Sequence, residues 1–100
     1  MVFSRQMKEI RIVEHLKKRL KDRALTRDLP KKIYHTAQER YLDQTTEKIV
    51  ALQEIRTGDR RGTIALIYEE TLESVTLITI HPIKSNQKEN RIASGRWKRL

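Results

Sequence analysis

A chain of 100 residues with 37% hydrophobic content supports one domain with a modest core. It has no cysteine, which excludes disulfides, thiolate nucleophiles and cysteine metal ligands. Its 22 Lys and Arg residues against 13 Asp and Glu residues give a formal net charge of +9. We therefore expect a single domain over residues 1–100 that is attracted to polyanions, to nucleic acid ahead of an anionic membrane surface or an acidic protein.

The positive charge is concentrated at the two ends of the chain. Residues 1–35 hold eleven basic and four acidic side chains (+7), residues 36–83 hold five and eight (−3), and residues 84–100 hold six and one (+5). If the fold brings the ends together, they form one positive surface. If it does not, the C-terminal stretch is a basic tail. We predict that the two ends meet.

The first predicted element is a helix over residues 10–23, although residues 10–12 also suit a short extended segment. Its apolar positions keep helical spacing: Ile10, Val13, Leu16 and Leu20. On the same helix His15, Arg19 and Arg23 recur every four residues and form one polar stripe. Arginine binds phosphate bidentately, and its charge favours the neutral form of a nearby imidazole. The alternative is that the stripe is an ordinary solvated helix face.

A second helix is predicted from Asp28-Leu29-Pro30, where Asp28 is the cap and Pro30 lies in the first turn. Ile33, Ala37 and Tyr41 would form its buried face, and it should run to about Leu42.

Three strands are predicted next, over residues 48–55, 63–69 and 74–80, because β-branched residues replace helix formers there. Their short connections favour an antiparallel meander. The third strand is almost continuously apolar, which indicates a central or well-covered position. It should stop at Pro82, which cannot donate to a ladder. The predicted fold is thus α+β, with two N-terminal helices, a three-stranded antiparallel meander and a basic C-terminal segment or short helix.

The C-terminal segment offers a short helix over residues 85–93 and then a flexible basic tail over residues 94–100. Candidate nucleic-acid contacts in this segment are Lys84, Lys88, Arg91, Arg96 and Trp97, and Arg23 joins them from the first helix. Trp97 between basic residues could stack on an unpaired base, or it could dock the tail onto the core.

The His15-x-x-x-Arg19-x-x-x-Arg23 pattern, followed by a polar turn, a second helix, a strand run and a basic segment, resembles small bacterial domains of uncharacterised function. Their N-terminal pattern is His-Ala-x-x-Arg-Met-x-x-Arg, and they look distantly like the BrnT and RelE toxins of toxin–antitoxin pairs. Here Leu16 and Leu20 stand in the alanine and methionine positions, and the spacing to the second arginine is one residue longer.

The resemblance implies metal-independent RNA cleavage. That reaction needs a base for the ribose 2′-hydroxyl proton, an acid for the leaving 5′-oxygen, and cations for the charge of the phosphorane. Candidates for base and acid are His15 and His81, and candidates for the stabilising cations are Arg19, Arg23, Lys84 and Arg91. We expect His15 and Arg19 to act in this chemistry, while His81 before Pro82 could equally end the strand, and His35 is more typical of a structural or surface histidine.

Three function classes remain open on the sequence: a toxin-like ribonuclease, a non-catalytic nucleic-acid-binding module, and a basic protein-interaction domain. Paired carboxylates, glycine-rich phosphate loops and metal-ligand clusters are missing from the sequence, so we expect neither a cofactor nor a metal. The expected partners are RNA rather than DNA and an acidic antitoxin protein. We expect no membrane contact and a cytoplasmic location, because no apolar stretch reaches the length of a span and residues 1–5 lack a signal-peptide character.

Overall fold

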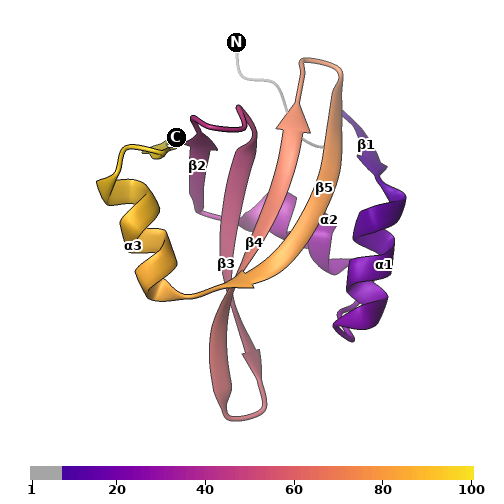
Figure 1. Ribbon diagram of the computed structural model, residues 1–100. Helices are drawn as coiled ribbons and strands as arrows, with labels where there is room; N and C mark the ends of the chain where they lie inside the picture. Colours follow the sequence, from indigo (N-terminus) through magenta and orange to yellow (C-terminus); the bar gives the residue numbers. More distant parts are fainter. Residues whose placement is uncertain (1–7) are drawn as a thin grey trace.

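The computed structural model describes residues 8–100, and residues 1–5, considered above for a signal peptide, lie outside this range. Along the described residues the elements are β1 (Glu9–Ile12), α1 (Glu14–Asp22), α2 (Leu29–Thr36), β2 (Glu39–Asp43), β3 (Ile49–Thr57), β4 (Arg60–Glu70), β5 (Ser74–Ile83), α3 (Ser85–Ala93) and β6 (Trp97–Arg99). The strands form one sheet in the order β1-β5-β4-β3-β2-β6 (Figure 1).

The α+β class is confirmed, but the predicted three-stranded meander with two N-terminal helices is wrong. The three predicted strands correspond to β3, β4 and β5, which do pair antiparallel in succession. The sheet also includes β1, which runs parallel to β5, and β2 and β6, which pair antiparallel at the other edge. The result is a mixed sheet of six strands, with helix α3 at the bounds predicted for the short C-terminal helix.

The strands outside the meander lie in segments for which the sequence favours a helix or a tail. Ile10 pairs with Val75, and Ile12 pairs with Leu77, so residues 10–12 adopt the extended alternative that the sequence also allows, and the helix begins later, at Glu14. The predicted second helix ends at Thr36 instead of near Leu42, because Ala37 adopts an extended backbone with φ −60° and ψ 129°. The chain then enters β2, whose partners are β3 and β6.

The buried guanidinium of Arg40 in β2 shows why this segment belongs to the sheet. It donates hydrogen bonds to the carbonyl oxygens of Ala37 and Tyr34 and, over 2.8 Å, to the hydroxyl of Tyr68. It also lies over the rings of Tyr34 and Tyr68, at 5.7 and 6.0 Å from their centroids. These contacts join the end of α2 to β4, and a continued helix could not make them.

Strand β5 continues through Pro82 to Ile83, so the prediction that it stops at Pro82 is also wrong. Pro82 lies opposite Ile64 of β4. Within residues 8–100, β1 covers the outer side of β5 from Ser74 to Leu77, and Pro82 lies beyond that stretch. A missing N–H is tolerated there, because it points to an open edge. As predicted, β5 has neighbours on both sides, β1 and β4.

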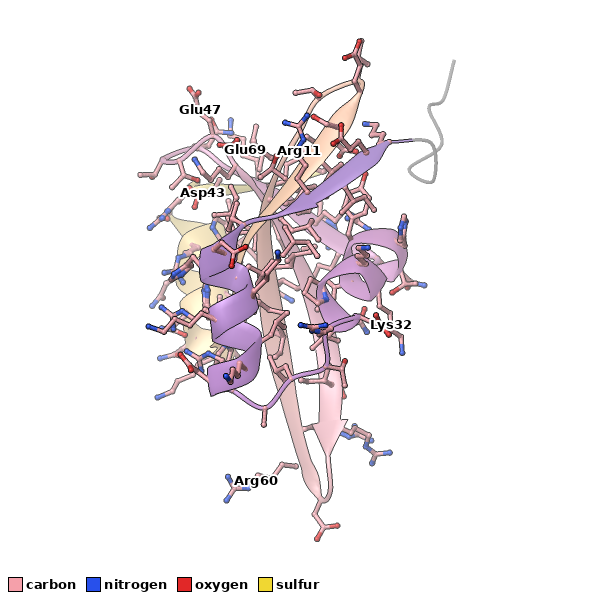
Figure 2. The ribbon with its side chains drawn as sticks, turned by 90° about the vertical axis from the view of Figure 1, so that its right-hand side faces the viewer. Arg11, Lys32, Asp43, Glu47, Arg60 and Glu69 are labelled. Atoms are coloured by element: carbon pink, nitrogen blue, oxygen red, sulfur yellow. The ribbon has the colours of Figure 1, made fainter. Side chains whose placement is uncertain are left out.

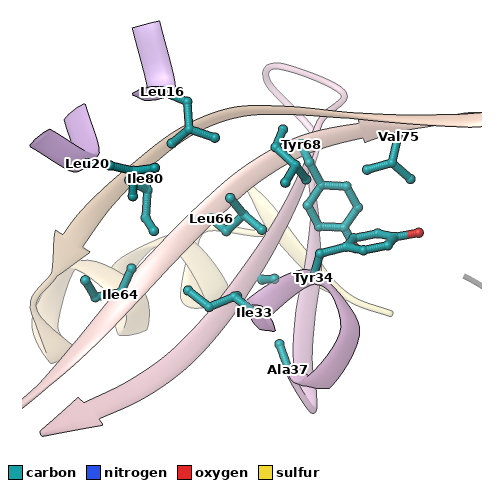
Figure 3. Packing of buried hydrophobic residues seen from close by; sticks show 12 residues of the cluster. Leu16, Leu20, Ile33, Tyr34, Ala37, Ile64, Leu66, Tyr68, Val75 and Ile80 are labelled. Carbon is teal, nitrogen blue, oxygen red and sulfur yellow. The ribbon is translucent and has the colours of Figure 1, made fainter. Parts of the chain in front are cut away.

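Both faces of the sheet are partly buried. Helices α1 and α2 cover one face through a cluster that includes Leu16, Leu20, Ile33, Tyr34, Leu66, Tyr68 and Ile80 (Figure 3). The rings of Tyr34 and Tyr68 meet edge to face there, with 5.2 Å between centroids. The other face carries a smaller cluster of Tyr41, Val50, Leu52, Ala65, Ile83 and Trp97. Figure 2 shows α2 and the yellow helix α3 on opposite sides of the sheet.

Among the helices formed by residues 8–100, none combines the length and the apolar character that crossing a membrane requires.

Candidate nucleic-acid interface

His15 and Arg19 form the predicted polar stripe on α1, whose opposite side is fixed in the core, whereas Arg23 lies just beyond the helix as its C-cap residue. Leu16 and Leu20 are buried against β5 and its neighbours, so α1 cannot rotate about its axis. Arg19 donates its Nε hydrogen to Nε2 of His15 over 3.4 Å. His15 and Arg19, together with Lys18 and Asp22, line a hollow of about 220 Å³. The stripe is therefore an exposed, cationic surface that carries one imidazole.

His81 lies on β5 opposite Ala65, half-buried at the edge of the strand. Burial lowers the pKa of His81 below its ordinary value, and the positive charges of Arg91, Arg23 and Arg19 lower it further. The lowered pKa means that the neutral imidazole is the stable form of His81 near neutral pH. The charges that act on this ring come from Arg19 in α1, from Arg23 directly after α1 and from Arg91 in α3.

The topology explains how residues so far apart in sequence meet. β1 runs along β5 as far as Leu77, and α1 follows β1 after a single residue, so α1 lies beside the next part of β5. Helix α3 starts two residues after β5 ends, and it packs next to β6 on the other sheet face. The charges of Arg19 and Arg23 at the end of α1 and of Arg91 in α3 all act on His81, which is consistent with the prediction that the two basic ends meet.

The arginines around His81 are available for a ligand. Within residues 8–100, no ion pair joins a carboxylate to Arg19, Arg23 or Arg91. Arg91 packs on Trp97, because its guanidinium lies over the indole ring, 5.4 Å from the centroid. We name His81, Arg19, Arg23 and Arg91 the His81 cluster. A neutral imidazole among three cations suits a phosphodiester, which each guanidinium can bind through two hydrogen bonds.

Two of the predicted nucleic-acid contacts are engaged within the protein. Arg96 binds the carboxylate of Asp43 through two hydrogen bonds of 3.0 and 3.1 Å. Burial alone would raise the pKa of Asp43, but the bonds from Arg96 and from the backbone of Thr45 and Thr46 lower it. Lys88 forms an ion pair with Glu39. These contacts fasten the C-terminal segment to the sheet.

Trp97 is buried, with an exposed fraction of 4%. Its ring stacks on Tyr41 with 5.4 Å between centroids, on the side of the sheet that α3 covers. Its Nε1 has no hydrogen-bond partner among the described residues. The structure thus places this ring in the core, under Arg91, and it joins α3 and β6 to β2.

Lys84, the remaining predicted contact, is exposed, and so is His35, for which the sequence favours a structural or surface role. Lys84 directly precedes α3, and its backbone N–H donates to the side chain of Gln87 over 2.9 Å, so Lys84 is fixed at the start of that helix, three residues after His81. His35 lies on α2 with its ring 5.1 Å from Tyr34, on the sheet face opposite to α3. His35 is therefore separate from the His81 cluster.

Sequence reasoning missed two cationic features. The first is the end of the β3–β4 hairpin, which carries the exposed residues Arg56, Arg60 and Arg61. The second is a hollow of about 790 Å³ between α1 and α2, with Ile12, Leu20 and Leu25 in its wall and Lys17, Lys21 and Lys31 among its charged residues. The sequence Arg60-Arg61-Gly62 could have indicated the cationic end of the hairpin, because two arginines stand beside a glycine of the predicted turn. The hollow between α1 and α2 could not be predicted, because it depends on how the two helices pack.

Among residues 8–100, no three His, Cys, Asp or Glu side chains lie together in a way that could hold a metal ion. Comparison with known proteins gives no match to any family model, curated protein or solved structure.

Proposed function

We propose that this protein is a toxin-like endoribonuclease that uses only protein groups in catalysis. The observation that carries the proposal is the His81 cluster, in which burial and the positive charges of three arginines lower the pKa of a half-buried imidazole on β5. The resemblance of the α1 stripe to BrnT-like and RelE-like toxins points to the same reaction. RNA is favoured over DNA, because the 2′-hydroxyl of RNA supplies the nucleophile.

In the proposed reaction, neutral His81 accepts the proton of the ribose 2′-hydroxyl. The 2′-oxygen then attacks the adjacent phosphorus, and the bond to the 5′-oxygen breaks, which leaves a 2′,3′-cyclic phosphate. Arg19, Arg23 and Arg91 stabilise the extra negative charge that develops on the phosphorane oxygens. A general base is most effective when its pKa lies near the working pH, and a lowered histidine pKa keeps the base unprotonated.

The leaving 5′-oxygen needs a proton, and His15 is the second imidazole on this surface. In its neutral form His15 accepts the hydrogen bond from Arg19. In its protonated form an imidazole can donate a hydrogen bond to the leaving 5′-oxygen. This assigns His81 as the base and His15 as the acid.

The test is cleavage of a mixed-sequence RNA in the presence of chelator, scored for 2′,3′-cyclic phosphate ends. We expect His81→Ala to lower the rate by about 10²- to 10⁴-fold, while RNA affinity stays close to that of the wild type. His35→Ala is the matched control, because it removes a histidine from the opposite side of the sheet. Circular dichroism checks that each variant is folded. A wild-type protein that cleaves no RNA, or a folded His81→Ala variant that cleaves as well as the wild type, contradicts the assignment.

A non-catalytic nucleic-acid-binding module is the second candidate, and the same cationic surface favours it. In that case the wild type binds RNA with a strong dependence on salt and yields no cyclic phosphate. Binding without cleavage therefore selects this candidate.

An acidic protein partner is also part of the proposal, with the hollow between α1 and α2 as its docking site. Apolar Ile12, Leu20 and Leu25 suit the apolar side chains of an amphipathic segment, and the surrounding lysines suit its carboxylates. The hollow lies on a different side of α1 from His15 and Arg19, so the partner and the RNA would contact different sides of this helix. Such a partner and RNA would meet this protein in the cytoplasm.

A further inference from the structure

We infer that the end of the β3–β4 hairpin is a second phosphate-binding arm, which holds the RNA strand where it leaves the His81 cluster. The inference rests on the ribonuclease proposed above and deepens it, because it names the substrate class: a strand of several nucleotides rather than a dinucleotide. We name residues 55–62 the arm.

The arm extends beyond the rest of the sheet. Strand β5 accompanies β4 as far as the pair Thr63–Ile83, whereas β3 and β4 stay paired through Arg56–Arg61 and Thr57–Arg60. Gly58, with φ +62°, allows the tight turn that closes the arm. Figure 1 shows the arm projecting below the body of the molecule, past the end of β5.

The side chains of the arm are suited to phosphate. Arg56, Arg60 and Arg61 are all exposed, and Figure 2 shows Arg60 pointing outward from the tip. Two acidic residues accompany these arginines: Asp59 is exposed in the turn, and Glu54 lies 3.7 Å from Arg61 in an exposed and therefore weak ion pair. A β-carbon added at Gly62 would meet no atom within 4 Å, so the space beside the strands is open there.

The arm is continuous with the His81 cluster. His81 lies opposite Ala65, and Arg61 precedes Ala65 by four residues on β4. At a rise of about 3.3 Å per residue, that separation is about 13 Å along the strand. An RNA strand with its scissile phosphate at His81 reaches the arm within a few nucleotides. This continuity favours nucleic acid over an acidic protein as the ligand of the arm.

The experiment compares two RNA lengths and three proteins. The probes are a dinucleotide and a single-stranded RNA of about 12 nucleotides, within the range of single-strand site sizes. The proteins are the wild type, the triple variant Arg56→Gln, Arg60→Gln, Arg61→Gln, and a control with Arg11→Gln, Lys32→Gln, Lys98→Gln. The control removes the same amount of charge from other exposed positions. Affinity is measured over a series of salt concentrations, and cleavage is measured on both probes.

We expect the triple arm variant to bind the long RNA more weakly and with a shallower salt dependence. Each phosphate contact contributes about 0.7 to the slope of log affinity against log salt for a single strand, so three lost contacts reduce the slope by about 2. Its cleavage of the dinucleotide should equal that of the wild type. Replacing the three arginines by lysines should restore most of the slope, since charge is kept.

The outcomes separate the arm from the proposed function. If the wild type cleaves RNA and the folded arm variant keeps the wild-type slope on the long RNA, the arm is not a binding site and the ribonuclease stands. If the control variant loses as much slope as the arm variant, the effect is net charge, and the arm is again refuted. If the wild type neither binds nor cleaves RNA, both proposals fall.

Discussion

Arg19 and His15 are joined across one turn of α1 by a hydrogen bond of 3.4 Å, and the charge of Arg19 also acts on His81. One guanidinium thus connects the two imidazoles that the proposed reaction uses. The variants of these two residues should therefore separate proton transfer from charge stabilisation.

For His15→Ala we expect cleavage to fall by about 10²-fold or more, because the proton donor is lost. RNA affinity should stay nearly unchanged, since no permanent charge is removed. Stability should change by less than about 0.5 kcal/mol, because His15 is exposed. Steady-state kcat and KM on one RNA substrate measure this, and a folded variant with wild-type kcat excludes His15 as the acid.

For Arg19→Ala we expect both kcat and RNA affinity to fall. The expected decrease in kcat is about 10²- to 10³-fold, which is the usual loss when one group that stabilises the transition state is removed. Arg19→Lys keeps the charge but cannot bind phosphate bidentately. It should recover affinity more than kcat. Equal recovery of both would mean that Arg19 acts only through its charge.

The lowered pKa of His81 links folding to pH. Burial and the charges of Arg91, Arg23 and Arg19 keep this imidazole neutral in the folded protein, whereas the unfolded chain binds a proton at its ordinary pKa of about 6.5. The unfolded state therefore binds more protons just below that pH, and stability falls as pH decreases through this window until folded His81 also becomes protonated. Urea unfolding between about pH 7.5 and pH 5 measures the effect.

The variant His81→Gln should lose this part of the pH dependence while keeping that of the carboxylates. The carboxylates Asp43 and Glu39, whose pKa values the fold also lowers, affect stability at more acidic pH. If His81→Gln and the wild type lose the same stability between about pH 7.5 and pH 5, His81 is not the group that causes this pH dependence.

Arg96→Gln should destabilise the protein with little effect on RNA affinity. The change leaves the buried carboxylate of Asp43 without its charged partner. Loss of one partner from a fully buried pair costs about 3 to 5 kcal/mol, and the partial exposure of Arg96 lowers our expectation to about 2 kcal/mol. Thermal unfolding and RNA binding on the same samples test this, and a stable variant with weakened binding would return Arg96 to the nucleic-acid contacts.

Trp97 allows a comparison between packing and hydrogen bonding. Trp97→Ala should cost about 3 to 5 kcal/mol, because it opens a large cavity beside Tyr41. Trp97→Phe should cost about 1.5 kcal/mol or less, since the indole Nε1 that it removes has no partner among the described residues. Chemical denaturation gives both values, and a similar loss in the two variants would point to a hydrogen bond at Nε1.

The strands that could be predicted are those with a local signal. β3, β4 and β5 each carry a run of β-branched and apolar residues, and a turn with Gly58 separates the first two. β1 has four residues and runs parallel to a strand more than 60 positions later, so its pairing leaves no trace in its own sequence. In β2, Tyr41 continues the four-residue spacing of Ile33 and Ala37, and its pairing with β3 and β6 overrides the helical pattern.

The candidate site shows the same division. The stripe of His15 and Arg19 was readable, because helical periodicity is local and Leu16 and Leu20 mark the buried side. The meeting with His81 and Arg91 depends on where β1 ends along β5, which only the sheet topology fixes. In the same way, Arg96 and Lys88 have the composition of phosphate contacts, but their acidic partners come from β2.

The order of strands and helices also sets when the site can exist during translation. Arg19 and Arg23 are synthesised early, but Arg91 follows about seventy residues later, and β6 must then pair with β2. Chains grow from the N-terminus, and their early segments fold first. A nascent chain that ends before α3 lacks one of the three cations around His81. If the protein cleaves RNA, the growing polypeptide is therefore weakly active or inactive, and the ribosome that makes it is exposed to the full activity only when synthesis of α3 is complete.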